Sequence, residues 1–179
     1  MKDLFVSPVE LAGTEARSQT GEKSDLSSSA GFLDGVGSIL RPDWGADAKK
    51  LFGTWRLLET KNDGHVRPER GARPLGLITY HESGWMSAQI QPDRPPIRMV
   101  GAEPTAQEAV AALLGYTAYF GSFSVDETMK IITHRRLGSV TPGWEQKRDY
   151  LRAYTFEGPD RVMLRPLGNR NSLLWERLV

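Results

Sequence analysis

Short runs of strand-forming residues between turn signals are the feature of this sequence that most limits its fold. From residue 51 onward these runs occupy 54–60, 75–80, 85–91, 116–125, 129–136, 146–156, 161–166 and 172–178. The connections are rich in Gly, Pro, Asn and Asp, which favour turns. About eight strands at near-regular spacing predict a mainly β protein, an eight-stranded antiparallel closed barrel. Closure removes the sheet edges that a protein otherwise has to protect.

A single helix interrupts the strand pattern. Thr105 and Glu108 have the T-x-x-E spacing of a capping box, and a run of good helix formers follows them. Gly115 stands where a glycine commonly follows the last helical turn. The sequence therefore predicts one short helix at about 105–114.

The first 48 residues differ from the rest of the chain. Residues 18–31 are polar and Ser-rich, which favours flexibility over packing. The segment that follows contains Phe32 and Trp44 among glycines, and Pro42 ends its weak helical spacing. We expect an N-terminal extension at 1–48 and a barrel domain at 49–179. The extension has two interpretations: an arm that packs against a neighbouring chain in a homo-oligomer, or a lid across a pocket.

Composition argues against several classes of function. The 179 residues include 23 Lys or Arg and 22 Asp or Glu, for a net charge of +1. Because the Arg are scattered, neither nucleic acid nor a membrane is an expected partner. Cysteine is absent and the three His have no metal-ligand spacing, so we expect no metal and no other cofactor. The sequence shows no apolar membrane span and no signal peptide, which predicts a cytoplasmic location.

One pair of side chains is a candidate for catalysis. With Asp126 and Glu127 at a hairpin tip, Tyr119 lies opposite His134. A phenol beside an imidazole can transfer a proton or orient a ligand. The alternative is a structural hydrogen bond in the barrel wall, which is the more common role of a lone buried histidine.

The register of the hairpin that turns at 157–160 predicts which strand faces lie inside. It places Ala153 opposite Leu164 on an apolar face that we expect in the interior, with Arg152 and Arg165 in solvent. The reverse orientation would line the interior with Arg and Tyr, which suits an acidic or carbonyl-bearing ligand.

Further ligand-binding candidates come from the strand faces and ends. In the run 85–91, apolar packing puts the Met86 face inside, whereas a polar pocket would turn Gln89 inward. Aromatic residues near strand ends are placed at the barrel mouth. The predicted ligand-binding residues are Tyr80, Trp85, Met86, Gln89, Tyr116, Trp144, Arg148 and Tyr150.

Several motifs resemble those of a known family. Gly53-Thr54-Trp55 matches the G-x-W signature at the first strand of lipocalins and other calycins. The segments GTWRL, GLITY, GWMSAQ and the terminal WER extend the resemblance over about 51–179 to the lipocalin-like domain family. The resemblance implies a closed barrel with a lumen, in which Arg177 stacks on Trp55 at the closed end. Relatives with similar barrels include ligand carriers and cofactor-free cyclases or isomerases.

Two functions of different classes fit these features. The first is a cofactor-independent enzyme of cyclase or isomerase type, which acts on a small hydrophobic, natural-product-like substrate in the lumen. Tyr119 and His134 would be its catalytic residues. The alternative is a non-catalytic carrier or sensor that binds a small lipophilic ligand within the same walls. A barrel filled by its own side chains, acting through its surface, is a third possibility.

Overall fold

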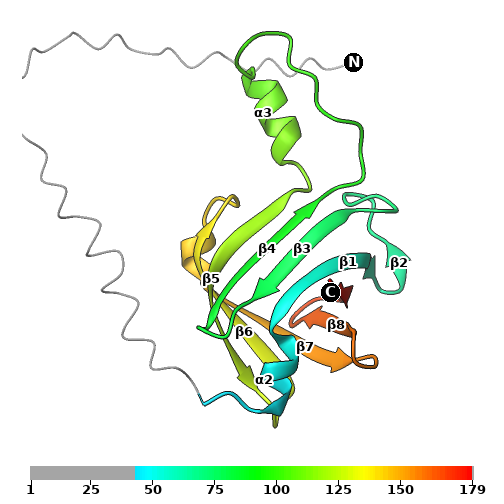
Figure 1. Ribbon diagram of the computed structural model, residues 1–179. Helices are drawn as coiled ribbons and strands as arrows, with labels where there is room; N and C mark the ends of the chain where they lie inside the picture. The colour runs from blue at the N-terminus through cyan, green and yellow to red at the C-terminus, as the bar shows by residue number, and fades with distance from the viewer. Residues whose placement is uncertain (1–42, 179) are drawn as a thin grey trace, which may run out of the picture. The chain divides into compact units, whose positions relative to one another are not determined.

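Eight antiparallel strands form a closed barrel in the computed structural model, which describes residues 43–178 apart from the side chain of Glu145 (Figure 1). The strands are β1 (Gly53–Asn62), β3 (Leu75–Tyr80), β4 (Trp85–Gln91), β5 (Thr117–Asp126), β6 (Ile131–Ser139), β7 (Asp149–Phe156), β8 (Arg161–Pro166) and β9 (Asn171–Arg177). Each pairs with its neighbour along the chain, and β1 also pairs with β9. The two-residue strand β2 (His65–Val66) turns back and pairs antiparallel with the end of β1. The predicted fold class is confirmed.

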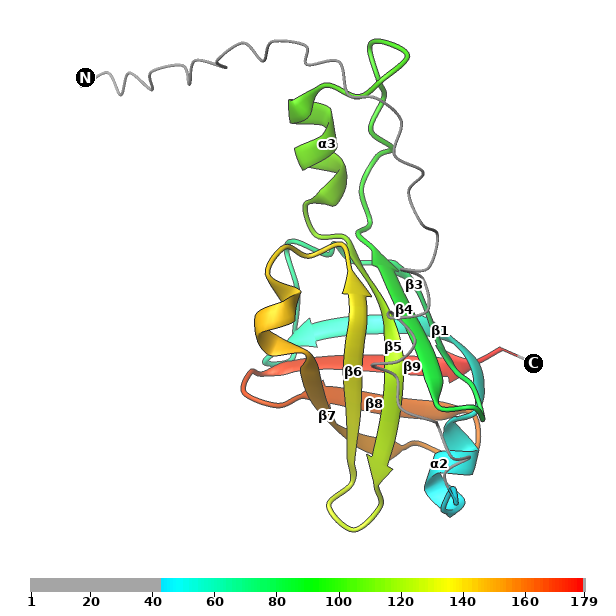
Figure 2. The same cartoon turned by 90° about the vertical axis from the view of Figure 1, so that its left-hand side faces the viewer.

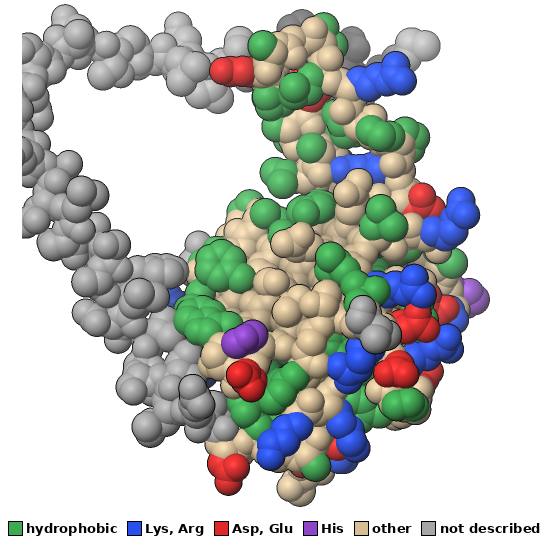
Figure 3. Space-filling view, in the orientation of Figure 1, with side chains coloured by type: hydrophobic (Ala, Val, Ile, Leu, Met, Phe, Trp, Pro, Cys, Tyr) green, Lys and Arg blue, Asp and Glu red, His purple; other side chains and the backbone are tan. Residues whose placement is uncertain are grey.

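The predicted helix is confirmed as α3 (Ala106–Leu113), on the connection between β4 and β5. Both hydrogen bonds of the Thr105–Glu108 capping box form. Gly115 follows the helix at φ 73°, which a residue with a Cβ adopts only with strain. No residue of α3 is buried, and apolar side chains gather over α3 and the segments beside it (Figure 3).

Two further short helices, α2 (Ala46–Leu51) and η1 (Trp144–Lys147), were not expected from the sequence. α2 lies directly before β1, so the predicted boundary between residues 48 and 49 falls inside it. Of the proposed arm or lid at 1–48, residues 1–42, which include Phe32, lie outside the described residues. No helix in the described part of the chain is long and apolar enough to cross a membrane.

Alternate side chains of the strands fill the barrel. Met86, Ala88 and Ile90 of β4 are all buried, whereas Gln89 between them is exposed on the outer surface. The Met86 face is therefore the interior face, and the alternative that turned Gln89 inward is wrong. The largest completely buried apolar side chains are Trp55, Trp175, Tyr80, Leu51, Ile78, Ile132, Leu164 and Val162.

α2 covers the end of the barrel at which β1 begins, and α3 and η1 lie at the other end (Figure 2). Leu51 of α2 is completely buried, and its carbonyl oxygen accepts a 2.7 Å hydrogen bond from Trp55 Nε1. The Arg177 guanidinium lies 4.2 Å from the centre of the Trp55 ring, and Arg177 Nη1 donates to the Phe52 carbonyl oxygen. This confirms the stacking that the resemblance implied.

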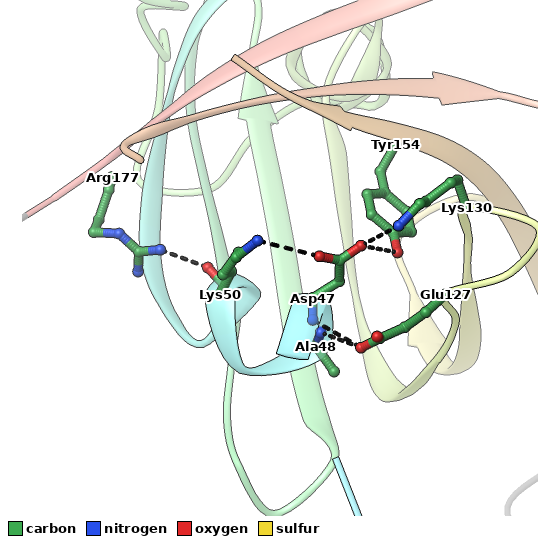
Figure 4. A network of polar contacts seen from close by, with 7 residues as sticks. All are labelled: Asp47, Ala48, Lys50, Glu127, Lys130, Tyr154 and Arg177. Atoms are coloured by element: carbon green, nitrogen blue, oxygen red, sulfur yellow. Dashed lines mark hydrogen bonds and ion pairs between the residues drawn. The ribbon is translucent and has the colours of Figure 1, made fainter. Parts of the chain in front are cut away.

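Polar contacts attach α2 to the strands beside it (Figure 4). Glu127 Oε1 accepts hydrogen bonds from the backbone nitrogens of Asp47 and Ala48, at 2.8 and 3.0 Å. Asp47 Oδ2 accepts from Lys130 Nζ at 2.5 Å and from the Tyr154 hydroxyl at 2.9 Å. The Lys130 hydrogen bond lowers the pKa of Asp47 despite its burial. Burial, and then the hydrogen bond to Asp47, raises the pKa of Tyr154.

Replacing Asp47 with asparagine should lower the free energy of unfolding by about 1 kcal/mol at pH 7. The side chain keeps its shape but loses the charge that pairs with Lys130, and Lys130 itself is largely exposed, so water screens part of the effect. Urea denaturation measures the difference. Asp43→Asn is the matched control, because Asp43 is exposed near the same end of the chain. Equal stability of the two variants would contradict the role given to Asp47.

Two hairpin registers differ from the predicted ones. Four residues, Glu127–Lys130, connect β5 to β6, so Phe123 pairs with His134, and Tyr119 pairs with Ser139 beyond a bulge. The predicted direct pairing of Tyr119 with His134 is wrong, because it assumed a two-residue turn.

In the β7–β8 hairpin Tyr154 pairs with Leu164, one residue away from the predicted pairing of Ala153. A slip of one residue exchanges the faces of a strand. Arg152, expected in solvent, is therefore turned into the barrel and is 6% exposed. Arg165 is exposed, as expected.

Candidate functional site

Four polar side chains from four strands meet inside the barrel: Tyr80 on β3, Tyr119 on β5, His134 on β6 and Arg152 on β7. The Tyr80 hydroxyl lies 2.8 Å from His134 Nε2, and the Tyr119 hydroxyl lies 2.9 Å from His134 Nδ1. Arg152 Nη2 donates to the Tyr119 hydroxyl at 3.1 Å. His134 is completely buried, and the other three side chains are almost completely buried. We call these four residues the polar cluster.

The positions of the protons follow from Arg152, because a guanidinium can only donate. Arg152 Nη2 donates to Tyr119, so Tyr119 directs its own proton to His134 Nδ1. Arg152 Nε also points at Nδ1, at 3.4 Å, so this nitrogen carries no proton. His134 is then protonated on Nε2 and donates to Tyr80.

The electrostatics of the polar cluster keep His134 neutral. Burial, and then repulsion by Arg152, lowers the pKa of His134 well below its ordinary value. Burial, and then the neighbouring Tyr119, raises the pKa of Tyr80 well above its own. The polar cluster is therefore an uncharged imidazole between two phenols, next to one permanent cation.

An inner cavity of about 50 Å³ lies beside the polar cluster. Tyr119 and Arg152 form part of its wall, and Ile78, Ala88 and Leu164 are among its apolar lining residues. Tyr150 also lines it, with its ring 4.2 Å from the Arg152 guanidinium. The remaining polar lining residues are Arg67, Arg70, Thr117 and Asn171.

A larger mouth pocket of about 380 Å³ adjoins this cavity. The two spaces share three lining residues, namely Thr117, Tyr119 and Tyr150. The mouth pocket is completed by residues of β6, η1 and the β8–β9 turn, including Arg136 and Lys147. η1 and the end of β6 that leads to it lie away from α2 (Figure 2). The lining residues therefore place the inner cavity and the mouth pocket on the side that α2 does not cover.

The structure brings some of the predicted site residues together. Tyr119 and His134 are in contact, Tyr80 joins them through the imidazole, and Tyr150 lines both spaces. The contact between Tyr119 and His134 forms although the predicted register was wrong, because both side chains are on the interior face and are long enough to meet.

The other predicted residues lie elsewhere. Met86 is buried in the apolar core, and Trp85 begins β4 at the end that α2 covers. Gln89 and Tyr116 line a groove on the outer surface of β3 and β4. Trp144 is half-buried in η1 and Arg148 is exposed beside it, and neither lines the inner cavity or the mouth pocket.

Sequence reasoning missed several of the cationic lining residues. Arg67 and Arg70 belong to a loop rich in Pro, Gly and Arg, and Lys147 ends η1 in the β6–β7 connection, whereas Arg136 is a residue of β6. The positions of Arg67, Arg70 and Lys147 depend on the conformations of the connections, for which the sequence carries no periodic signal. In the described part of the chain, no three potential metal-ligating side chains come together.

A closed eight-stranded antiparallel barrel with a polar cluster and a pocket at one mouth is a lipocalin-like architecture, which suggests small-molecule binding. The family model described as "lipocalin-like domain" matches residues 52–177, and the chain belongs to this family.

Other comparisons show only distant similarity. No curated protein matches the chain. A structure of a redesigned beta barrel is similar at 12% identity and a TM-score of 0.38, over 74% of this chain and 95% of that one. A DUF4847 family protein from Bacteroides vulgatus is similar at 9% identity and a TM-score of 0.41, over 75% of this chain and 98% of that one.

Proposed function

We propose that the protein binds a small organic molecule at the open end of the barrel, as a carrier or sensor. The observation that carries the proposal is the junction of the inner cavity and the mouth pocket at Thr117, Tyr119 and Tyr150. The mouth pocket, at about 380 Å³, has a size common for ligand sites. The inner cavity combines aromatic and apolar walls with a few directed hydrogen-bonding groups, which is typical of ligand sites.

A probe with no charge tests this binding function directly. We expect Nile red to bind the protein saturably, and Thr117→Trp to weaken its binding at least tenfold, about 1.4 kcal/mol, by filling the junction. Fluorescence titration measures the affinity. Thr155→Trp is the matched control, since Thr155 is exposed on the outer face of β7. Equal affinities in the two variants, or no saturable binding to the unmodified protein, would contradict the proposal.

A second candidate is a cofactor-independent cyclase or isomerase acting on a natural-product-like substrate. The placement of the Tyr119 hydroxyl favours it, because a carrier does not need such an arrangement. The Tyr119 hydroxyl borders both spaces, and together with Arg152 it can stabilise negative charge that develops on a substrate oxygen, while neutral His134 positions the phenol.

Tyr119→Phe separates the two candidates, because it removes the hydroxyl and keeps the ring. Under both candidates Nile red affinity should change less than tenfold. Compounds that raise the melting temperature would be incubated with the protein and followed by mass spectrometry. Tyr154→Phe is the control, because Tyr154 lies at the end covered by α2. Chemical conversion of a compound that is lost in Tyr119→Phe but kept in Tyr154→Phe supports the enzyme. Binding of the compounds without conversion supports the carrier or sensor.

A further inference from the structure

The walls of the inner cavity and the mouth pocket have an unbalanced charge. Arg67, Arg70 and Arg152 line the inner cavity, and Arg136 and Lys147 line the mouth pocket. Within the described part of the chain, neither lining includes an Asp or a Glu. The whole chain has a net charge of only +1, so this concentration of cations is local.

Arg70 is buried without an acidic partner. Its side chain is 8% exposed, Nη2 donates to Thr117 Oγ1 at 2.5 Å, and Nη1 donates to the backbone carbonyl oxygens of Ile90 and Gly115. Its Nε is buried and has no hydrogen-bond partner in the described structure. Burial, and then repulsion by Arg67, lowers the pKa of Arg70.

Arg152, on another wall of the inner cavity, is also buried without an acidic partner. Its guanidinium donates to Tyr119 and His134, both neutral, and lies over the ring of Tyr150. No carboxylate among residues 43–178 pairs with it. By contrast, Arg67 pairs with Glu69, so the unpaired cations of the inner cavity are Arg70 and Arg152.

Trp175 supplies a further unmet donor. It lines the inner cavity, and its Nε1 is buried with no partner in the described structure. Buried cations and unpaired donors are costly when no acceptor meets them. All of these groups donate hydrogen bonds, so the group that suits the inner cavity is an acceptor with negative charge.

We propose that the ligand of this site is an amphipathic carboxylic acid, whose carboxylate lies in the inner cavity between Arg70 and Arg152. This inference rests on the proposed binding function and specifies its ligand. A carboxylate accepts several hydrogen bonds at once, and guanidinium groups match its geometry.

The sizes of the two spaces determine the shape of the acid. The inner cavity of about 50 Å³ has room for roughly three to five water-sized groups, enough for a carboxylate and little more. The rest of the molecule extends through the junction at Thr117 into the mouth pocket, beside Tyr150 and Leu167. The carboxylate is then fully desolvated, while the body stays partly exposed at the mouth.

An acid and its amide of equal shape test the charge requirement. We expect 2-naphthoate to bind at least tenfold more tightly than 2-naphthamide in calorimetric titrations at pH 7.5 in a chloride-free buffer. Equal affinities, or no binding of 2-naphthoate at millimolar concentration, overturn the inference. If Nile red still binds in that case, the binding function stands without the acid. If neither class of probe binds, both proposals fall.

Single substitutions locate the carboxylate. Arg70→Gln and Arg152→Gln should each reduce the preference for the acid at least fivefold, and Arg70→Lys should keep part of it. Arg165→Gln is the matched control, because Arg165 is exposed outside the barrel. An unchanged affinity for Nile red verifies that each variant is folded. If Arg152→Gln does not bind Nile red, Arg70→Gln alone tests the position of the carboxylate. A preference that survives in Arg70→Gln but disappears in Arg136→Gln overturns the placement in the inner cavity.

Discussion

Replacing Trp55 with alanine is expected to lower the free energy of unfolding by about 3–5 kcal/mol, the usual cost of removing a large buried aromatic side chain. Trp55 is completely buried under α2. Its loss leaves a cavity, removes the donor to the Leu51 carbonyl oxygen, and removes the ring on which Arg177 stacks. Urea denaturation at pH 7 measures the change.

Two other substitutions show whether the loss of stability is specific to Trp55 or follows the removal of any tryptophan. Trp85→Ala, at a half-buried strand end, should cost only about 1 kcal/mol. Trp55→Phe keeps an aromatic ring and loses the hydrogen bond, so its cost should lie between the two. If Trp55→Ala and Trp85→Ala are equally mild, Trp55 does not have the structural role given to it here.

The unfolding free energy should also fall by up to about 2 kcal/mol between pH 7.5 and pH 5.0, because of His134. In the folded protein, burial and Arg152 hold the pKa of His134 well below its ordinary value, which is about 6.5 in an unfolded chain. Between those two pKa values the unfolded chain binds a proton that the folded chain does not. Stability is therefore complete above pH 7 and falls by up to about 1.4 kcal/mol per pH unit as the pH drops below 6.5.

Substitution of each of the three histidines by glutamine tests the source of this pH dependence. His134→Gln should remove most of the slope between pH 7.5 and 5.0, although it also lowers stability throughout. His65→Gln and His81→Gln should keep the slope, since both side chains are exposed. The pKa of Asp47 is lowered from 3.8, so its own contribution is lost only at more acidic pH. An unchanged slope in His134→Gln would contradict the buried neutral state.

The strands whose ends carry clear turn signals could be located from the sequence alone. β3, β4 and β8 have the predicted bounds, because alternating side chains stop at Gly-, Pro- or Asp-containing turns. The capping box and Gly115 located α3 for the same reason, since these signals act through adjacent backbone atoms.

The register of the β5–β6 hairpin could not be read in this way. The Asp126 side chain accepts a hydrogen bond from the backbone of Met129, and Lys130 takes a left-handed conformation with φ 54°. Such a position usually attracts Gly or Asn, so a lysine there gives no sign of a four-residue turn. The bulge between Phe120 and Gly121 shifts the pairing again.

The candidate site depended on these registers and on loops. A slip of one residue was enough to place Arg152 outside the barrel in the sequence prediction. Arg70 reaches the inner cavity from a loop whose direction is set by contacts with the carbonyl oxygens of Ile90 and Gly115, 20 and 45 residues away. Interactions of this range have no periodic signature in a sequence.

The pairing of β1 with β9 has a consequence for how the chain folds. It joins Trp55 to Arg177 and Asn62 to Asn171, so the wall closes only through contacts between segments more than one hundred residues apart. To pair segments so far apart, the chain must lose much of its conformational entropy before the new contacts stabilise it. Folding is therefore slow. Until β9 has been synthesised, β1 and β8 each have an unpaired edge, and the nascent chain remains open to association with other strands during that time.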